Sequence, residues 1–198
     1  MRSRLLVLVC ACLLLTLIAA PGCDDENQPR SRVEIVRIAT SGTAIDLYST
    51  PFLSDVVDSG ADGDPGTEDD VVYEDQLLVT IENQPSSPQL VLDPDGAFGS
   101  VVLTGYRVDF DVDGQTLESV DPVVGSLHLI VPTGTKRMAA IVAVTAALKT
   151  QPPLSSLALS GGELMGSARI TFTGYEETSE EDVSATGTIQ IHFANWVD

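Results

Sequence analysis

Ser167-Ala-Arg-Ile-Thr-Phe-Thr-Gly-Tyr175 alternates apolar and polar side chains along its whole length. A second alternating stretch runs from Val183 to Phe193, after the polar segment Glu176 to Asp182. A period of two is typical of a β-strand with one buried face, whereas an amphipathic helix repeats its apolar residues every three or four positions. The two stretches around a polar connection therefore predict a β-hairpin.

Similar short runs, rich in β-branched residues, recur back to Val33 and are separated by Gly, Pro, Asp and Ser clusters. Seven runs are candidate strands: Val33 to Thr40, Leu77 to Asn83, Val101 to Val112, Leu127 to Val131, Met138 to Leu148, Ser167 to Tyr175 and Val183 to Phe193. We expect Leu127 to Val131 at a sheet edge, because Pro132 has no N–H to donate to a neighbouring strand. The pattern predicts an all-β fold, an immunoglobulin-like antiparallel β-sandwich of about seven strands.

One of these runs, Met138 to Leu148, is apolar on both faces and is compatible with a helix as well as a strand. Its β-branched residues Ile141, Val142 and Val144 favour a strand, because branching at Cβ restricts the side chain in a helix. A strand that is apolar on both faces is typical of a central, buried position. We therefore expect a buried central strand here, with a helix as the alternative.

The N-terminal residues have the pattern of an export signal. Met1 to Arg4 is positive, Leu5 to Ala19 is apolar without interruption, and Cys23 follows small residues. The segment Ala20-Pro-Gly-Cys23 resembles the lipid attachment site of bacterial lipoproteins, although Ala20 stands where such sites usually have Leu. The resemblance implies a signal peptide over residues 1–22, a lipidated Cys23 with a polar tether over 23–31, and a β-sandwich domain over 32–198. A plain secretory signal is the alternative.

The charge of the chain excludes one large class of partners. The formal net charge is −19, and removal of the signal leaves 8 basic and 29 acidic side chains. Nucleic-acid proteins need a basic face to neutralise phosphates, and the basic residues do not cluster in the sequence. We expect no nucleic-acid partner, and we expect membrane association to come from the lipid.

The densest acidic stretch is Asp55 to Asp75, which holds nine carboxylates and no cation. Its middle resembles the Asp- and Gly-rich calcium loops of secreted proteins, because hard cations need several oxygen ligands in a flexible loop. The candidate calcium ligands are Asp58, Asp62, Asp64, Glu68, Asp69 and Asp70. A solvated surface loop without metal is the alternative interpretation.

The segment Asp109-Phe-Asp-Val-Asp-Gly114 can be compared with an EF-hand loop, but the twelfth position holds Val120 in place of the required Glu. A strand with acids on its solvent face and an Asp-Gly turn explains the segment better. Catalytic residues are not evident: His128 and His192 are the two histidines, and neither has a nucleophile or metal-site motif around it. We expect no enzymatic activity.

The segments Leu103 to Phe110 and Ala168 to Ala194 resemble uncharacterised bacterial lipoproteins with a β-sandwich body. The resemblance implies a lipid-anchored, extracytoplasmic protein of the cell envelope, in the periplasm or on the cell surface, and carries no site residues. We expect a binding or structural module whose partner is an envelope protein or a glycan. A calcium-dependent adhesion or assembly domain is the first alternative, and a carbohydrate-acting enzyme is the second.

Overall fold

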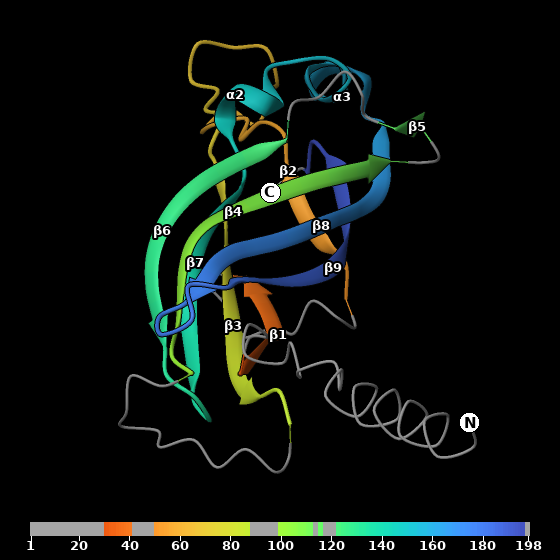
Figure 1. Ribbon diagram of the computed structural model, residues 1–198. Helices are drawn as coiled ribbons and strands as arrows, with labels where there is room; N and C mark the ends of the chain where they lie inside the picture. Colours follow the sequence, from red (N-terminus) through yellow and green to blue (C-terminus); the bar gives the residue numbers. More distant parts are fainter. Residues whose placement is uncertain (1–29, 41–49, 88–98, 113–114, 117–121, 197–198) are drawn as a thin grey trace, which may run out of the picture.

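The computed structural model describes residues 30–40, 50–87, 99–112, 115–116 and 122–196. Cys23 and the expected signal peptide and tether up to residue 29 lie outside these ranges. The described residues form an all-β fold with two sheets and two short helices (Figure 1). In this part of the chain, neither helix is long and apolar enough to cross a membrane.

The smaller sheet has three strands in the order β1, β3, β7, with β1 at Ser31–Thr40, β3 at Asp75–Pro85 and β7 at Lys136–Val144. The larger sheet has the order β2, β9, β8, β4, with β2 at Phe52–Asp55, β9 at Asp182–Ala194, β8 at Glu163–Glu176 and β4 at Val101–Val112. Two further strands pair with the free side of β4: β5 at Gln115–Thr116 and β6 at Val123–Val131. The long, curved strands of the larger sheet cross in front of β3 and β7 (Figure 1).

The predicted hairpin is confirmed as β8 and β9, which pair antiparallel from Glu163 opposite Ala194 to Tyr175 opposite Asp182. Its alternation has the expected cause, since Ile170 and Phe172 are fully buried. Aromatic rings also fill the space between strands, and Phe110 and Phe193 meet edge to face with ring centroids 5.9 Å apart. The core therefore lies between the inner faces of the two sheets.

All seven predicted runs overlap strands of the structure, and the expected edge position of Leu127 to Val131 is confirmed, because among the described strands β6 pairs with β4 alone. Two strands were not predicted, β2 and β5, which are only four and two residues long. Pairing is antiparallel between the described strands except for β2, which lies parallel to the end of β9. The all-β prediction is thus confirmed, with one parallel pair added to it.

The prediction of a buried central strand over Met138 to Leu148 is wrong in part. The strand β7 ends at Val144, and the helix α2 begins at Ala146. Among the described strands β7 pairs with β3 alone, and the side chain of Met138 is 60% exposed. The run is apolar throughout because the strand leads directly into a helix that buries Leu148, not because it lies in the middle of a sheet.

The open edge of β7 is covered from the opposite sheet. Tyr106 of β4 accepts a hydrogen bond on its hydroxyl oxygen from the backbone N–H of Val142, at 3.2 Å. The Tyr106 ring lies over Gly125 of β6, where an added Cβ would come within 2.2 Å of the ring. An edge N–H that is capped in this way is not available to another chain.

Candidate functional site

The acidic segment predicted from the sequence connects β2 to β3 and lies at one end of the sandwich, beside α2 at Ala146–Lys149 and α3 at Leu154–Ser160 (Figure 1). The strand registers define the two ends: Ser31 pairs with Pro85 at one end, and Asp75 pairs with Val144 at the other. The chain thus reaches β1 at the end opposite the acidic segment. We call residues 56–74 the acidic loop.

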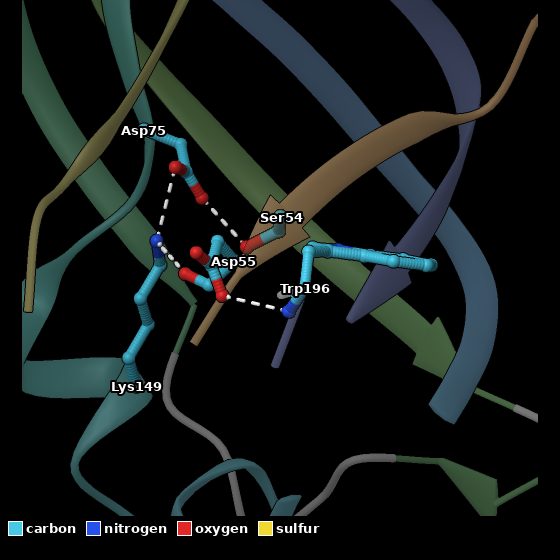
Figure 2. A network of polar contacts seen from close by, with 5 residues as sticks. All are labelled: Ser54, Asp55, Asp75, Lys149 and Trp196. Atoms are coloured by element: carbon cyan, nitrogen blue, oxygen red, sulfur yellow. Dashed lines mark hydrogen bonds and ion pairs between the residues drawn. The ribbon is translucent and has the colours of Figure 1, made fainter. Parts of the chain in front are cut away.

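A single buried lysine holds both ends of the acidic loop (Figure 2). Lys149, the last residue of α2, places Nζ 2.5 Å from the carbonyl oxygen of Asp55 and 3.0 Å from Oδ1 of Asp75. Ser54 donates from Oγ to Oδ2 of Asp75 at 2.6 Å. The Lys149 side chain is 1% exposed, so these contacts replace water around its charge. The residue that precedes the loop and the residue that follows it are therefore fixed to one point.

Asp75 is the partly buried carboxylate of this arrangement, with 17% of its side chain exposed. Burial raises the pKa of Asp75 above its ordinary value of 3.8, and the charge of Lys149 and the hydrogen bonds from Ser54 and Lys149 oppose that rise. Burial is the largest of these effects, because a carboxylate loses hydration that its partners restore only in part.

α2 brings Lys149 to this position. Thr145 caps the helix, since its hydroxyl oxygen accepts from the backbone N–H of Leu148 at 3.1 Å. The short helix carries its single basic residue in the last turn, where a cation interacts favourably with the helix dipole. Lys149 was not a candidate from the sequence, because its partners lie 74 and 94 residues away in the chain.

The acidic loop is braced from within by its own carboxylates. Four of them accept backbone N–H groups of the loop at 2.6 to 3.0 Å: Asp58 from Gly60, Asp62 from Asp64, Asp69 from Ala61 and Asp70 from Gly66. The backbone turns at three glycines with positive φ: Gly60, Gly63 and Gly66. A two-way backbone bridge between Asp58 and Val71 closes the base of the loop.

The six candidate calcium ligands all lie in this loop. Asp58 and Asp70 are half-buried, and the others are exposed: Asp62, Asp64, Glu68 and Asp69. The Thr67 hydroxyl, followed by the Ala61 N–H, lowers the pKa of Asp69 below 3.8. Across the part of the chain that the structure describes, no three side chains of Asp, Glu, His or Cys come together in a way that could hold a metal ion.

A groove of about 200 Å³ lies between the first half of the loop and Trp196. It is lined by Asp58, Ser59, Gly60, Ala61, Asp62, Gly63 and Trp196. Trp196 is held there by its backbone N–H, which donates to Oδ1 of Asp55 at 3.2 Å, while its indole points away from Lys149 (Figure 2). Trp196 was not predicted as part of this groove, because nothing in the sequence places it beside residues 58–63.

The other residues considered from the sequence lie in strands: Asp109 in β4, His128 in β6 and His192 in β9. Asp109 lies in β4 and pairs with Arg107 at 2.7 Å, so the strand interpretation of that segment is confirmed as far as Val112, and residues 113–114 lie outside the described ranges. His128 is exposed on β6. His192 faces Glu163, with Nδ1 2.7 Å from Oε1.

The polar connection from Glu176 to Asp182 lies at the opposite end of the sandwich from the acidic loop. Glu176 is fully buried and accepts the backbone N–H of Arg30 on Oε2 at 2.6 Å, so this carboxylate fastens the start of the domain. Comparison with models of known protein families gave no match, and neither did comparison with curated proteins.

Proposed function

We propose that this protein is a lipid-anchored, extracytoplasmic binding or structural module of the cell envelope, and that the acidic loop is its recognition element. One observation carries the proposal: the loop is exposed, rich in carboxylates, and fixed at both ends by Lys149. Binding residues are commonly found on loops whose ends are positioned by a rigid scaffold.

The proposed anchor is a lipid on Cys23, eight residues before Ser31 at the start of β1. A short tether leaves the anchored domain near the membrane, and the acidic loop then lies at the end of the sandwich away from the tether. The proposed location is the periplasm or the cell surface, and the proposed partner is an envelope protein or a glycan.

The proposal also covers the type of sandwich and the absence of catalytic activity. The sandwich is of the immunoglobulin-like type, which the arrangement of the longer strands in two facing sheets supports. The protein has no catalytic activity of its own, so turnover of an envelope polysaccharide by the purified protein would favour the carbohydrate-acting alternative. The calcium-dependent alternative uses the same loop, and it predicts a larger rise in melting temperature with calcium than with magnesium.

The anchor is tested by intact-mass analysis of the mature protein. The expected mass corresponds to a chain that begins at Cys23 and carries a diacylglyceryl group. Cys23→Ala is expected to remain unprocessed or to leave the membrane fraction, while Cys12→Ala, a matched change within the signal, is expected to be processed and lipidated normally. An unmodified Cys23 in the mature protein would contradict the anchor.

The recognition role is tested by charge removal at either end of the sandwich. Exchange of Asp62, Asp64 and Asp69 for Asn is expected to abolish partner capture from native envelope without a change in circular dichroism. The matched control exchanges Glu177, Glu180 and Glu181 for Gln at the other end. Equal loss of capture in both variants would assign binding to overall charge, and not to the acidic loop.

A further inference from the structure

Apolar side chains are exposed beside the acidic loop, on the outer face of the larger sheet. Leu53 of β2 and Met165 of β8 both pair with His192 of β9, so the three residues form one row across adjacent strands. Leu53 is 54% exposed and Met165 is 46% exposed, whereas their neighbour Ser54 points inward and is fully buried. The row therefore exposes two apolar side chains that the core does not use, on either side of His192, which contacts Glu163.

The groove lies next to this row. Asp55 pairs with Ala194 in the following row of the same face, and Trp196 stands two residues further along the chain. Trp196, which lines the groove together with residues 58–63, thus follows directly on the end of β9 that pairs with β2. We call this surface the β2 corner: Leu53, Met165, His192, Trp196 and the loop wall from Asp58 to Gly63.

The charge around the β2 corner specifies the sign of the charge that a partner must carry. Among the described residues of β2, the acidic loop, α2, α3 and residues 195–196, Lys149 is the one cation, and its ammonium is buried against Asp55 and Asp75. In the two strands that complete the corner, His192 of β9 contacts the Glu163 carboxylate, and the exposed Arg169 of β8 stands four positions beyond Met165. The loop wall contributes Asp58 and Asp62. The potential outside this corner is therefore negative, and it attracts a cationic partner and repels an anionic one.

The size and lining of the groove specify what enters it. Pockets for whole small-molecule ligands usually measure about 300 to 1,000 Å³. A groove of about 200 Å³ is smaller and suits one long side chain. Trp196, Asp58 and Asp62 are among the lining residues, and an aromatic ring and carboxylates both attract an ammonium or guanidinium group.

We propose that the β2 corner binds a basic, amphipathic segment of another polypeptide. A lysine or arginine side chain of that segment occupies the groove against Trp196, and its apolar side chains cover Leu53 and Met165. The proposal rests on the proposed role as a binding module and names the chemistry of the partner. It does not depend on the lipid at Cys23, so an unmodified Cys23 would remove the anchor and leave this inference in place.

Trp196 is the single tryptophan of the chain, so its fluorescence reports directly on the groove. The full-length protein in non-ionic detergent is titrated with three short synthetic peptides, which alternate Lys with Leu, Lys with Ser, and Glu with Leu. The Lys-Leu peptide is expected to change the Trp196 emission in a saturable manner and to bind more tightly than the Lys-Ser peptide. The Glu-Leu peptide is expected not to bind.

Two variants and two matched controls locate the binding surface. Leu53→Ala and Asp62→Asn are each expected to weaken Lys-Leu binding roughly tenfold. Val124→Ala, at a residue 68% exposed on β6, and Asp182→Asn, at the opposite end of the sandwich, are expected to leave it unchanged. Equal binding of the Lys-Leu and Lys-Ser peptides, equal effects of test and control variants, or an unresponsive Trp196 would each overturn the proposal.

Discussion

Lys149 and Asp75 form an ion pair at 3.0 Å across 74 residues of sequence, and the same ammonium also contacts the carbonyl oxygen of Asp55. The pair therefore does more than join α2 to β3. It brings together the two residues that flank the acidic loop and fixes the geometry from which the loop projects.

Lys149→Met is expected to destabilise the domain by about 3 kcal/mol, because the change leaves the partly buried Asp75 carboxylate without its cation. Urea unfolding of the purified protein measures the loss. Lys136→Met is the matched control, since the Lys136 side chain is 59% exposed and its longer, 3.4 Å pair with Glu82 is expected to contribute less than about 1 kcal/mol. Lys149→Met combined with Asp75→Leu is expected to recover part of the stability, and a double variant as unstable as the sum of the two single variants would contradict the pairing.

The stability contributed by Asp75 is expected to fall as the pH rises. Burial raises the pKa of Asp75 above 3.8 in the folded state, so the folded protein holds this proton more tightly than the unfolded chain does. The contribution is complete below pH 3.8 and is lost as the pH passes through the raised pKa. Unfolding of the protein and of Asp75→Asn across this window gives the difference curve. A difference that grows with pH would show that Lys149 outweighs burial.

Gly125→Ala is expected to destabilise the domain by about 1 to 3 kcal/mol, because the new methyl group overlaps the Tyr106 ring. Gly105→Ala is the control on the paired strand, where the nearest atoms would lie at 3.5 Å. Thermal unfolding compares the two variants. If Tyr106→Ala fails to relieve the effect of Gly125→Ala, the clash is not its cause.

Removal of the Tyr106 hydroxyl alone is expected to reduce the stability of the domain by less than Gly125→Ala does. Tyr106→Phe leaves the ring in place and frees the N–H of Val142, which corresponds to about 1 kcal/mol for a lost hydrogen bond. The uncapped edge of β7 is also expected to increase self-association, which light scattering at rising protein concentration measures. Unchanged stability together with unchanged scattering would show that the hydroxyl does not protect this edge.

Calcium and magnesium at equal millimolar concentration are expected to raise the melting temperature equally. Four loop carboxylates already accept backbone N–H groups, so a divalent cation stabilises the loop by screening its repulsion. A clearly larger shift with calcium would instead support a selective site, because only a cation that binds the folded state specifically stabilises it by mass action. Loss of that extra shift in Asp62→Asn would place the site in the acidic loop.

The strands could be predicted because each one carries its own pattern. In β8 and β9 the alternation of buried and solvent-facing residues is complete within a single run, so no knowledge of the partner strand is needed. The four residues of β2 are too few to establish a period, and their pairing partner lies near residue 191. The edge position of β7 was not predictable, because its apolar run continues into α2. No local pattern shows where the strand ends and the helix begins.

The acidic loop was also predictable, because the density of carboxylates is visible in the chain. The residues that contact the loop from elsewhere in the chain were not predictable. Lys149 is an ordinary lysine by sequence, and Trp196 reaches the loop only because the end of β9 lies beside β2. Contacts of this kind are properties of the folded topology, and a single sequence does not display them.

The parallel pairing of β2 with β9 also sets an order of events in time. Phe52 and its neighbours complete their backbone pairing only when Ile191 to Ala194 are present, although synthesis delivers them about 140 residues earlier. Until then the β2 side of the acidic loop is held by the contacts of Ser54 with Asp75 and of Asp55 with Lys149, without the backbone pairing to β9. A chain halted before β9 would therefore lack the strand that pairs with β2, even with the smaller sheet formed.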